Sequence, residues 1–381
     1  MGGGQSTNQS NTVLEGGGRA RVQSVKGTLV LENDKGKGGR KRQRRPSLML
    51  GDTLNFGENL EWSKIAIEGE IGRGNFGCVY KAHIEGKRVA VKEIFWEEAD
   101  EEGKQQDFLK ELETLKLVSH PNIVRYLGAV QEKPHYCFIT EYCEGSVGNF
   151  LMMVGKKKVQ VTWELLLNIA AGAARALEYM HGLDPQVLHR DIKAENLLLT
   201  DQFIVKVTDF GLSRVVYDGN KAKHMTTCGT IQWLAPEVIR GDRYDCAVDV
   251  YSYAITMWEL FNFEKPFKKH DPVHLPYLVV VKHLRPDLRK HLPKYLVELI
   301  SRCWHEDAEY RPPFTDVTKY IDKAKEYIDI KQAVDPSKPY DPSSDPEGTE
   351  RPQLSGKLSE KKATEEIVEE GGEEEEEGAE S

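Results

Sequence analysis

The chain has 381 residues, of which 30% are charged, and a formal net charge of −9, a size that allows one large two-part unit with flanking segments. Its six cysteines lie far apart without CxxC spacing, which argues against a disulfide framework or a zinc site and favours a reducing compartment. No apolar run reaches the roughly 18 residues of a membrane span, and the N-terminus lacks the apolar core of a secretory signal.

Both ends of the chain are expected to be disordered. The first sixty residues carry ten Lys or Arg against five Asp or Glu, and the last twenty hold ten Glu and one Lys. Residues 1–60, rich in Gly, Ser and Asn, and residues 331–381, a Pro- and Ser-rich stretch followed by the acidic tail, have too few apolar residues to offset the entropy of ordering. Since the middle of the chain has no basic excess, no nucleic-acid partner is expected.

Residues 61–143 predict a small antiparallel sheet with one helix. Short apolar segments separated by turn residues indicate strands. In the helix, Phe108, Leu109, Leu112, Leu115 and Val118 recur every three or four residues, as on a face packed against a sheet. The strands are expected at 64–72, 78–84, 87–95, 122–130 and 135–142, and the helix at 104–118.

Residues 144–330 change to a helical pattern. The segment 163–182 has a long apolar stripe, and 249–261 is apolar nearly all round, as a buried helix should be. Two later helices are expected at 295–304 and 315–328. The fold class is therefore α+β, with a five-stranded sheet region followed by a larger, mainly helical region that ends near Ile330.

Five strings carry the chemistry. The glycine-rich "IGRGNFGCV" (71–79) comes first, and "VAVK" (89–92) follows it. "HRDIKAEN" (189–196), "VTDFG" (207–211) and "APE" (235–237) come later, in that order. Each string alone is a weak signal, because a tight hairpin uses similar glycines and a polar loop similar acids. Their joint order argues against a strand-rich core with scattered acids.

Taken together, the strings resemble the nucleotide site and catalytic loop of protein kinases over about residues 61–329. The resemblance implies the two-lobe kinase fold, with ATP and Mg²⁺ as cofactors and protein hydroxyls as acceptors. Lys193, together with "HPNIVRYLGA" and "GTIQWLAPEVI", looks most like the tyrosine-kinase-like group of serine/threonine kinases. Ser or Thr is therefore the expected acceptor, and dual specificity stays open.

Lys92 is expected to hold the nucleotide. A lysine in the middle of an apolar strand needs a partner for its charge, whereas a lysine at a strand end would not. The resemblance implies Glu111 as that partner, with the pair holding the α- and β-phosphates. Glu113, two residues further along the same helix, faces elsewhere.

The catalytic loop supplies the remaining reacting groups. Asp191 is predicted to accept or orient the hydroxyl proton of the protein substrate, and Lys193 to neutralise charge on the transferred phosphoryl group. Asn196 and Asp209 offer the oxygen ligands that Mg²⁺ prefers. The alternative for all four residues is a polar loop with a satisfied aspartate cap.

The resemblance also implies a nucleotide pocket and two structural ties. Glycines let the backbone approach phosphates closely, and apolar residues enclose the adenine, although ordinary core packing would explain the same apolar residues. Glu237 and Arg311 match a buried ion pair of the large lobe, and Asp249 is expected to tie a helix start to the catalytic loop. The residues expected around the nucleotide are Ile71, Gly72, Gly74, Gly77, Val79, Ala90, Lys92, Thr140, Glu141, Cys143 and Leu198.

Phosphorylation and acylation signals lie outside this pocket. Thr226 and Thr227 are candidate phosphorylation sites that Arg190 could bind, or else simple solvated threonines. "MGGGQS" fits the N-myristoylation pattern at Gly2. The basic run from Arg40 to Arg45 could supply a second membrane signal, which phosphorylation of Ser47 would oppose. A glycine-rich start and a nuclear localisation run are the alternatives.

The sequence thus favours a cytoplasmic protein serine/threonine kinase with protein substrates, and it leaves membrane association and a nuclear location open. Two rivals stay open: a kinase-like scaffold without turnover and a membrane-tethered adaptor. The presence of Lys92, Asp191, Asn196 and Asp209 argues against the scaffold. The substrate motif, the upstream activator and the oligomeric state do not follow from the sequence.

Overall fold

The computed structural model describes most of the chain between residues 55 and 344 and two short segments before it. The described residues are 19–25, 28–34, 55–57, 59–74, 77–95, 101–157, 160–216, 230–335 and 337–344. The signals at Gly2, 40–45, Ser47, Thr226 and Thr227, together with the acidic tail, lie outside these ranges.

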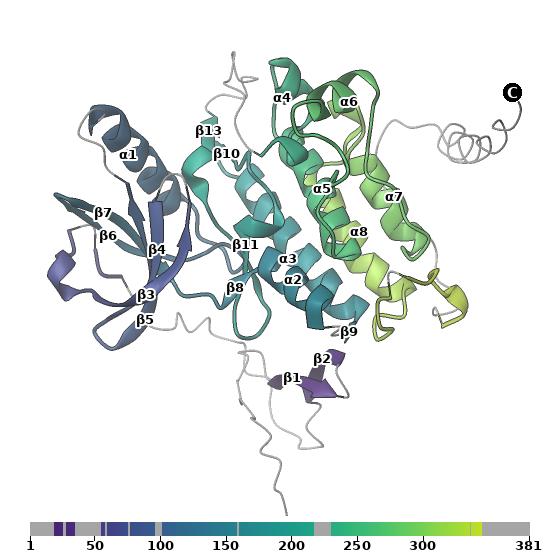
Figure 1. Ribbon diagram of the computed structural model, residues 1–381, viewed down its shortest axis with the longest axis horizontal. Helices are drawn as coiled ribbons and strands as arrows, with labels where there is room; N and C mark the ends of the chain where they lie inside the picture. Colours follow the sequence, from purple (N-terminus) through teal and green to yellow (C-terminus); the bar gives the residue numbers. More distant parts are fainter. Residues whose placement is uncertain are drawn as a thin grey trace, which may run out of the picture.

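The small lobe is a five-stranded antiparallel sheet with one helix beside it (Figure 1). The strand order is β3-β4-β5-β7-β6. In β5, Val89 and Val91 are buried in the core, so period-two alternation turns Ala90 and Lys92 to the opposite face. The elements are β3 (Ala66–Arg73), β4 (Gly77–Ile84), β5 (Lys87–Ile94), α1 (Glu101–Leu117), β6 (Tyr126–Glu132) and β7 (His135–Glu141).

Most of the apolar stripe predicted for α1 packs against the sheet. Phe108, Leu112, Leu115 and Val118 are buried, and the Phe108 ring stacks on a phenylalanine of β7. Leu109 differs from the prediction, because 41% of it is exposed. Neighbouring helix residues point about 100° apart, so the sheet covers Phe108 and leaves Leu109 in solvent.

The large lobe is mainly helical, and most of its short strands lie on the side nearest the sheet lobe, whereas the strand Gln160–Val161 lies away from it (Figure 1). The helices are α2 (Val147–Lys157), α3 (Trp163–His181), α4 (Pro236–Arg240), α5 (Ala247–Asn262), α6 (Leu275–Val281), α7 (Lys294–Cys303) and α8 (Phe314–Tyr327). The strands are β8 (Gly145–Ser146), β9 (Gln160–Val161), β10 (Gln186–Leu188), β11 (Leu197–Leu199), β12 (Val205–Val207) and β13 (Arg214–Val216). The predicted two-lobe α+β fold is confirmed.

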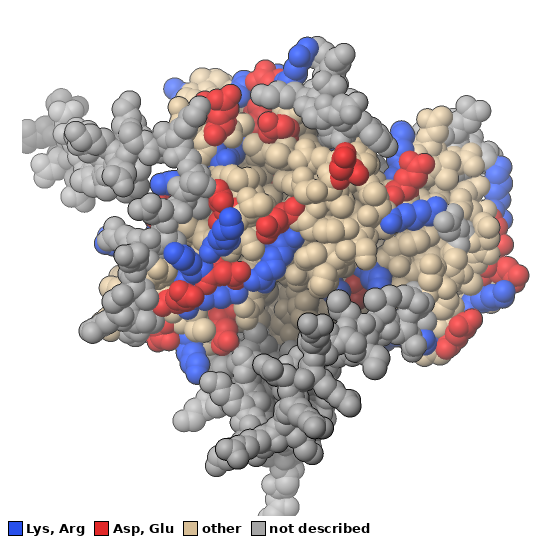
Figure 2. Space-filling model, turned by 180° about the vertical axis from the view of Figure 1, so that it is seen from behind, with Lys and Arg blue, Asp and Glu red and all other residues tan. Residues whose placement is uncertain are grey.

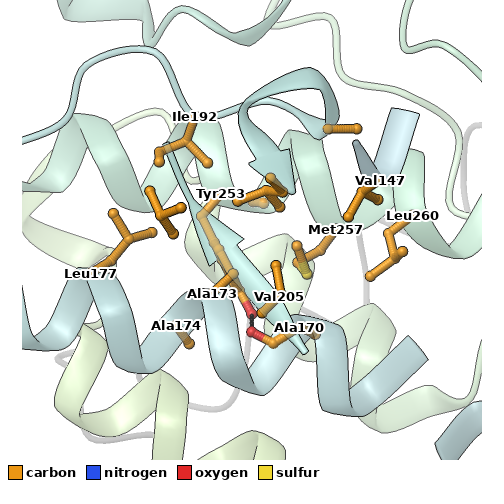
Figure 3. Packing of buried hydrophobic residues seen from close by; sticks show 14 of the residues in the cluster. Val147, Ala170, Ala173, Ala174, Leu177, Ile192, Val205, Tyr253, Met257 and Leu260 are labelled. Carbon is orange, nitrogen blue, oxygen red and sulfur yellow. Dashed lines mark hydrogen bonds between the residues drawn. The ribbon is translucent and has the colours of Figure 1, made fainter. Parts of the chain in front are cut away.

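The core of the large lobe forms where α3 and α5 meet the strand segments, as Figure 3 shows. Small residues of α3, among them Ala170 and Ala173, allow a close approach of Tyr253 and Met257 from α5. The buried Tyr253 hydroxyl donates to the Ala170 carbonyl at 3.0 Å. A buried hydroxyl that has such a partner fixes the two helices without an unpaired polar group.

The N-terminal flank contains structure that the sequence prediction did not include. β1 (Arg19–Val25) and β2 (Thr28–Asp34) pair antiparallel, and β2 also pairs in parallel with β9 of the large lobe. This differs from the disorder expected for residues 1–60. The hairpin itself is local, but β9, which holds it against the large lobe, is distant in the sequence, so local composition does not reveal that contact.

The C-terminal flank is also ordered beyond the expected limit near Ile330. Val334 is buried, and its N–H donates to the Val161 carbonyl at 2.8 Å. The ring of Tyr340 packs on Trp163 with centroids 6.1 Å apart. The described part of the segment that was expected to be disordered therefore packs against the start of α3.

Charges of both signs are interspersed on the face of the molecule seen in Figure 2. Exposed ion pairs of this kind, such as Arg175 with Asp322 at 2.7 Å, contribute at most about 1 kcal/mol each. Among the helices that the structure describes, none combines the length and the apolar content needed to cross a membrane.

Candidate active site

The catalytic loop holds Asp191 in a network of short hydrogen bonds. Lys193 Nζ donates to Asp191 Oδ2 at 2.6 Å and to Thr230 Oγ1 at 2.7 Å. Asn196 Nδ2 donates to the same Asp191 oxygen at 2.9 Å, and the Thr230 N–H donates to Asp191 Oδ1 at 3.2 Å. The carboxylate is 6% exposed, so its orientation is fixed by these donors.

Lys92 joins the two lobes through two carboxylates. Its Nζ lies 2.8 Å from Glu111 Oε1 on α1 and 2.9 Å from Asp209 Oδ1 at the start of the "DFG" turn. Glu111, and not Glu113, is thus the α1 residue that pairs with Lys92. The contact brings together three elements that are far apart in the sequence.

The charges around Lys92 determine its protonation. Burial alone would lower the pKa of the Lys92 ammonium, but the carboxylates of Glu111 and Asp209 raise it above its ordinary value. Burial likewise would raise the pKa of Asp209, yet the Lys92 charge and hydrogen bond hold it below its usual range. Lys92 is therefore a cation and Asp209 an anion at neutral pH.

Asp249 fixes the backbone of the catalytic loop from below. It is fully buried at the start of α5, and its carboxylate accepts the N–H groups of His189 and Arg190 at 2.8 Å each. His181 Nε2 lies 2.8 Å from the same carboxylate. Burial would lower the pKa of His181, but the hydrogen bond to Asp249 raises it to about 9. The tie expected from the resemblance is present, and His181 is an added partner.

The rest of this face of α5 also contacts the active site, a feature that the sequence analysis missed. Ser252 Oγ donates to the Trp233 carbonyl at 2.7 Å, and Thr256 Oγ1 donates to the Ile192 carbonyl at 3.1 Å. Glu259 follows on the same face and is 1% exposed. These polar positions, three or four residues apart, form one helical stripe that could have been found within a segment described only as apolar.

The three glycines of the glycine-rich turn serve different needs. A Cβ at Gly77 would lie 2.2 Å from the Glu93 carbonyl oxygen, so pairing with β5 requires glycine there. A Cβ at Gly74 would meet no atom within 4 Å, and one at Gly72 only Val79 at 3.9 Å. Protein packing in the described residues does not require these two glycines, which fits the prediction that they leave room for a ligand.

The residues predicted around the adenine lie along the edges of both lobes. Ala90 is opposite Thr140 on neighbouring strands, and Leu198 lies on β11 of the large lobe. Ile71 is 49% exposed, whereas Val79, Ala90, Thr140 and Leu198 are all partly exposed. Apolar side chains that a folded chain leaves uncovered at an interlobe edge offer a surface for an apolar ring.

The segment that links the lobes is anchored from the large lobe. Glu141 Oε1 accepts from the Arg125 N–H at 2.8 Å and pairs with Lys206 Nζ of β12 at 2.8 Å. The Glu141 N–H donates to the Arg125 carbonyl, so that donor is not free for a nucleotide, and Cys143 is buried. Sequence reasoning missed Lys206, because its partner is distant in the chain.

The donor set at Asn196 and Asp209 fits a hard cation. The Asn196 amide nitrogen is used toward Asp191, which leaves its oxygen as an acceptor, and Asp209 is a partly exposed carboxylate. Within the described ranges, no group of three or more His, Cys, Asp or Glu residues is placed to hold a metal. A cation here would need phosphate or water oxygens in addition, as Mg²⁺ commonly has.

Two further predictions concern the large lobe. Arg311 and Glu237 form the expected buried ion pair, with nitrogen–oxygen distances of 2.6 and 2.9 Å. Arg190 Nε donates to the Leu212 carbonyl at 2.5 Å, and its Nη1 lies 3.3 Å from the Tyr244 hydroxyl. A surface cavity of about 760 Å³ opens beside Glu237. It contains none of the predicted catalytic residues and is separate from this site.

The sequence is similar to known proteins over the segment that holds these residues. A family model described as protein tyrosine and serine/threonine kinase matches residues 65–321. The serine/threonine/tyrosine-protein kinase HT1 of Arabidopsis thaliana is 36% identical over 280 residues, 71% of this chain and 70% of that protein. The probable serine/threonine-protein kinase SIS8 of the same plant is 35% identical over 256 residues, 67% of this chain and 24% of that protein.

A probable serine/threonine-protein kinase of Dictyostelium discoideum is 37% identical over 265 residues, 69% of this chain and 28% of that protein. The chain thus spans about a quarter of the length of SIS8 and of the Dictyostelium protein. The similarity lies in the segment that holds the Lys92 contacts and the Asp191 network. This chain belongs to the protein tyrosine and serine/threonine kinase family.

Proposed function

We propose that this chain transfers the γ-phosphate of MgATP to Ser or Thr hydroxyls of proteins. One observation carries the proposal: Lys92 contacts both Glu111 and Asp209 while Asp191 is oriented beside Lys193 and Asn196. Phosphoryl transfer needs little covalent help from a protein, and its rate comes from positioning and charge stabilisation. A chain with these groups already in contact can supply both.

Each group has a part in the reaction. Asp191 orients the substrate hydroxyl and accepts its proton, and Lys193 offers positive charge to the phosphoryl oxygens. Lys92, held by Glu111, binds the nucleotide phosphates. Asn196 and Asp209 would hold Mg²⁺, which when bound would supply further charge neutralisation.

Two features support Ser or Thr as the acceptor. Lys193 lies two residues after Asp191 and contacts Thr230, so the loop matches the serine/threonine pattern. SIS8 and the Dictyostelium protein are named probable serine/threonine-protein kinases. HT1 is named a serine/threonine/tyrosine-protein kinase, so tyrosine is included in the test.

The proposal is tested by incubating the purified chain with labelled ATP and Mg²⁺, beside the Asp209→Ala variant. We expect label on Ser and Thr of the chain or of an added protein substrate, and a loss of at least about a hundredfold in the variant. Mass spectrometry then assigns the labelled residues. A folded wild type that binds nucleotide and transfers no phosphate contradicts the proposal and favours the scaffold.

We also propose that the enzyme works in the cytoplasm and associates with anionic membranes through acylated Gly2 and the basic run from Arg40 to Arg45. One acyl chain binds membranes only marginally, and basic residues add roughly 1 kcal/mol each near an anionic surface. Mass spectrometry of the intact N-terminus tests the first signal. An unacylated Gly2 in protein from its own cells contradicts it.

A further inference from the structure

A lysine lies beside the catalytic loop in contact with two acids that the proposed mechanism does not use. Lys265 Nζ is 2.8 Å from Glu259 Oε1 and also contacts Glu195 Oε1. It lies 5.3 Å from the centre of the Trp233 ring. One ammonium group thereby meets the end of α5, the catalytic loop and the segment that follows Thr230.

The buried acid in this cluster retains unused capacity to accept hydrogen bonds. Glu259 is 1% exposed, and within the described residues its Oε2 has no hydrogen-bond partner. Burial raises the pKa of Glu259 to about 7 against the opposing charge of Lys265. A cationic donor stabilises a buried carboxylate, and here Lys265 of the same chain is that donor.

The cluster lies where a protein substrate must pass. Glu195 is the residue directly before Asn196, whose side chain binds Asp191, and 43% of the Glu195 side chain is exposed. Trp233 closes the turn that begins after Thr230, which also contacts Asp191. A peptide whose hydroxyl reaches Asp191 therefore lies within a few residues of the Lys265 ammonium.

We infer that Lys265 fills a subsite for a basic substrate side chain, so that the enzyme accepts protein substrates without selecting Arg or Lys near the acceptor. This inference rests on the proposed function. The ammonium of Lys265 already occupies one oxygen of the exposed Glu195 and one of the buried Glu259, where a substrate cation would otherwise bind. A substrate arginine has to displace it and exchanges one ion pair for another, which leaves little net gain in transition-state binding.

The experiment compares four proteins on a peptide library in which each position around a fixed Ser or Thr is varied in turn. The proteins are the wild type, Lys265→Gln, Lys265→Gln combined with Glu195→Gln, and Lys268→Gln. Glutamine at 265 keeps a donor for Glu259 and removes the charge. Lys268 is a matched control, because it is half exposed and pairs with Glu264 at 2.5 Å outside the cluster.

We expect the wild type to show no preference for Arg or Lys over Ala. Lys265→Gln should raise the kcat/KM ratio of basic over neutral peptides by about fivefold at one position, the size of one surface charge interaction. The double variant should lose this gain, and Lys268→Gln should match the wild type. Lys268→Gln should also keep its activity on neutral peptides, whereas the other two variants are judged only by the ratio of basic over neutral peptides.

Three results overturn the inference. The first is an unchanged preference in Lys265→Gln, and the second is the same change of preference in Lys268→Gln. The third is a strong preference for Arg or Lys in the wild type, which decides the question even where a variant fails to fold. A wild type that phosphorylates no peptide and no protein contradicts the proposed function itself and the inference with it.

Discussion

The catalytic loop and the glycine-rich turn are both short motifs, yet the structure supports them in opposite ways. His189, Asp191 and Asn196 are buried, and α5 binds the loop through side chains along one helical face. In the glycine-rich turn, Ile71 is 49% exposed, and no packing atom of the described residues lies within 4 Å of the position a Cβ at Gly74 would take. The first motif is preorganised by the fold, whereas the second is left open for its ligand.

Removal of the Asp249 carboxylate is expected to destabilise the preorganised catalytic loop more strongly than any other change. Asp249→Ala leaves two buried backbone N–H groups and His181 without their acceptor, at a cost of about 3 to 5 kcal/mol in unfolding free energy. Urea unfolding measures the loss. Asp322→Ala, which removes an exposed ion pair with Arg175, is the control and should cost at most about 1 kcal/mol. Equal losses in the two variants would contradict this account.

Within the glycine-rich turn, Gly77→Ala should lower the unfolding free energy by about 1 to 3 kcal/mol. The added methyl group would lie 2.2 Å from the Glu93 carbonyl, so β4 and β5 must separate. Thermal or urea unfolding of the nucleotide-free protein checks this. An unchanged stability would mean that the two strands are not paired as described.

Gly74→Ala should instead leave the stability of the fold unchanged and weaken the use of ATP. Since no atom lies within 4 Å of the added methyl group, we expect the unfolding free energy to stay within about 0.5 kcal/mol of the wild type. If backbone approach to phosphates explains this glycine, the KM for ATP should rise severalfold. An unchanged KM would remove the ligand as the reason for glycine here.

The smallest expected effect is the pH dependence of the stability that the His181–Asp249 pair contributes beneath the catalytic loop. The pKa of His181 is raised from 6.5 to about 9 in the folded chain, so its stabilising contribution is complete below pH 6.5 and is lost as the pH rises through 9. His181→Gln keeps a donor to Asp249 without titrating. The difference in melting temperature between the wild type and this variant should therefore shrink from pH 6.5 to 9. A constant difference would show that the charge of His181 is not involved.

The sequence predicted the elements whose pattern is local. Short apolar segments and the stripe of α1 predicted the sheet and its helix, and the ordered strings placed Lys92, Asp191 and Asp209 in one site. The roles of these residues in catalysis stay predictions. Leu109 differed because two adjacent apolar residues cannot both face the sheet.

The features that the sequence did not predict depend on partners far away in the chain. The role of Lys206 depends on Glu141, and the attachment of the β1–β2 hairpin to the large lobe depends on β9. The polar stripe of α5 was hidden because its residues are few and lie among large apolar ones. Propensity describes a segment by itself, whereas these contacts arise from tertiary structure.

The contrast between the catalytic loop and the glycine-rich turn rests on the claim that the preorganised Asp191 takes part in phosphoryl transfer. Asp191→Asn keeps the shape of the side chain and removes its charge, so a fluorescence titration with ATP and a phosphate-transfer assay on the same preparation test the claim most directly. We predict that nucleotide affinity stays within about twofold and that transfer falls by about a hundredfold or more. Transfer at the wild-type rate by a folded Asp191→Asn protein would contradict the account.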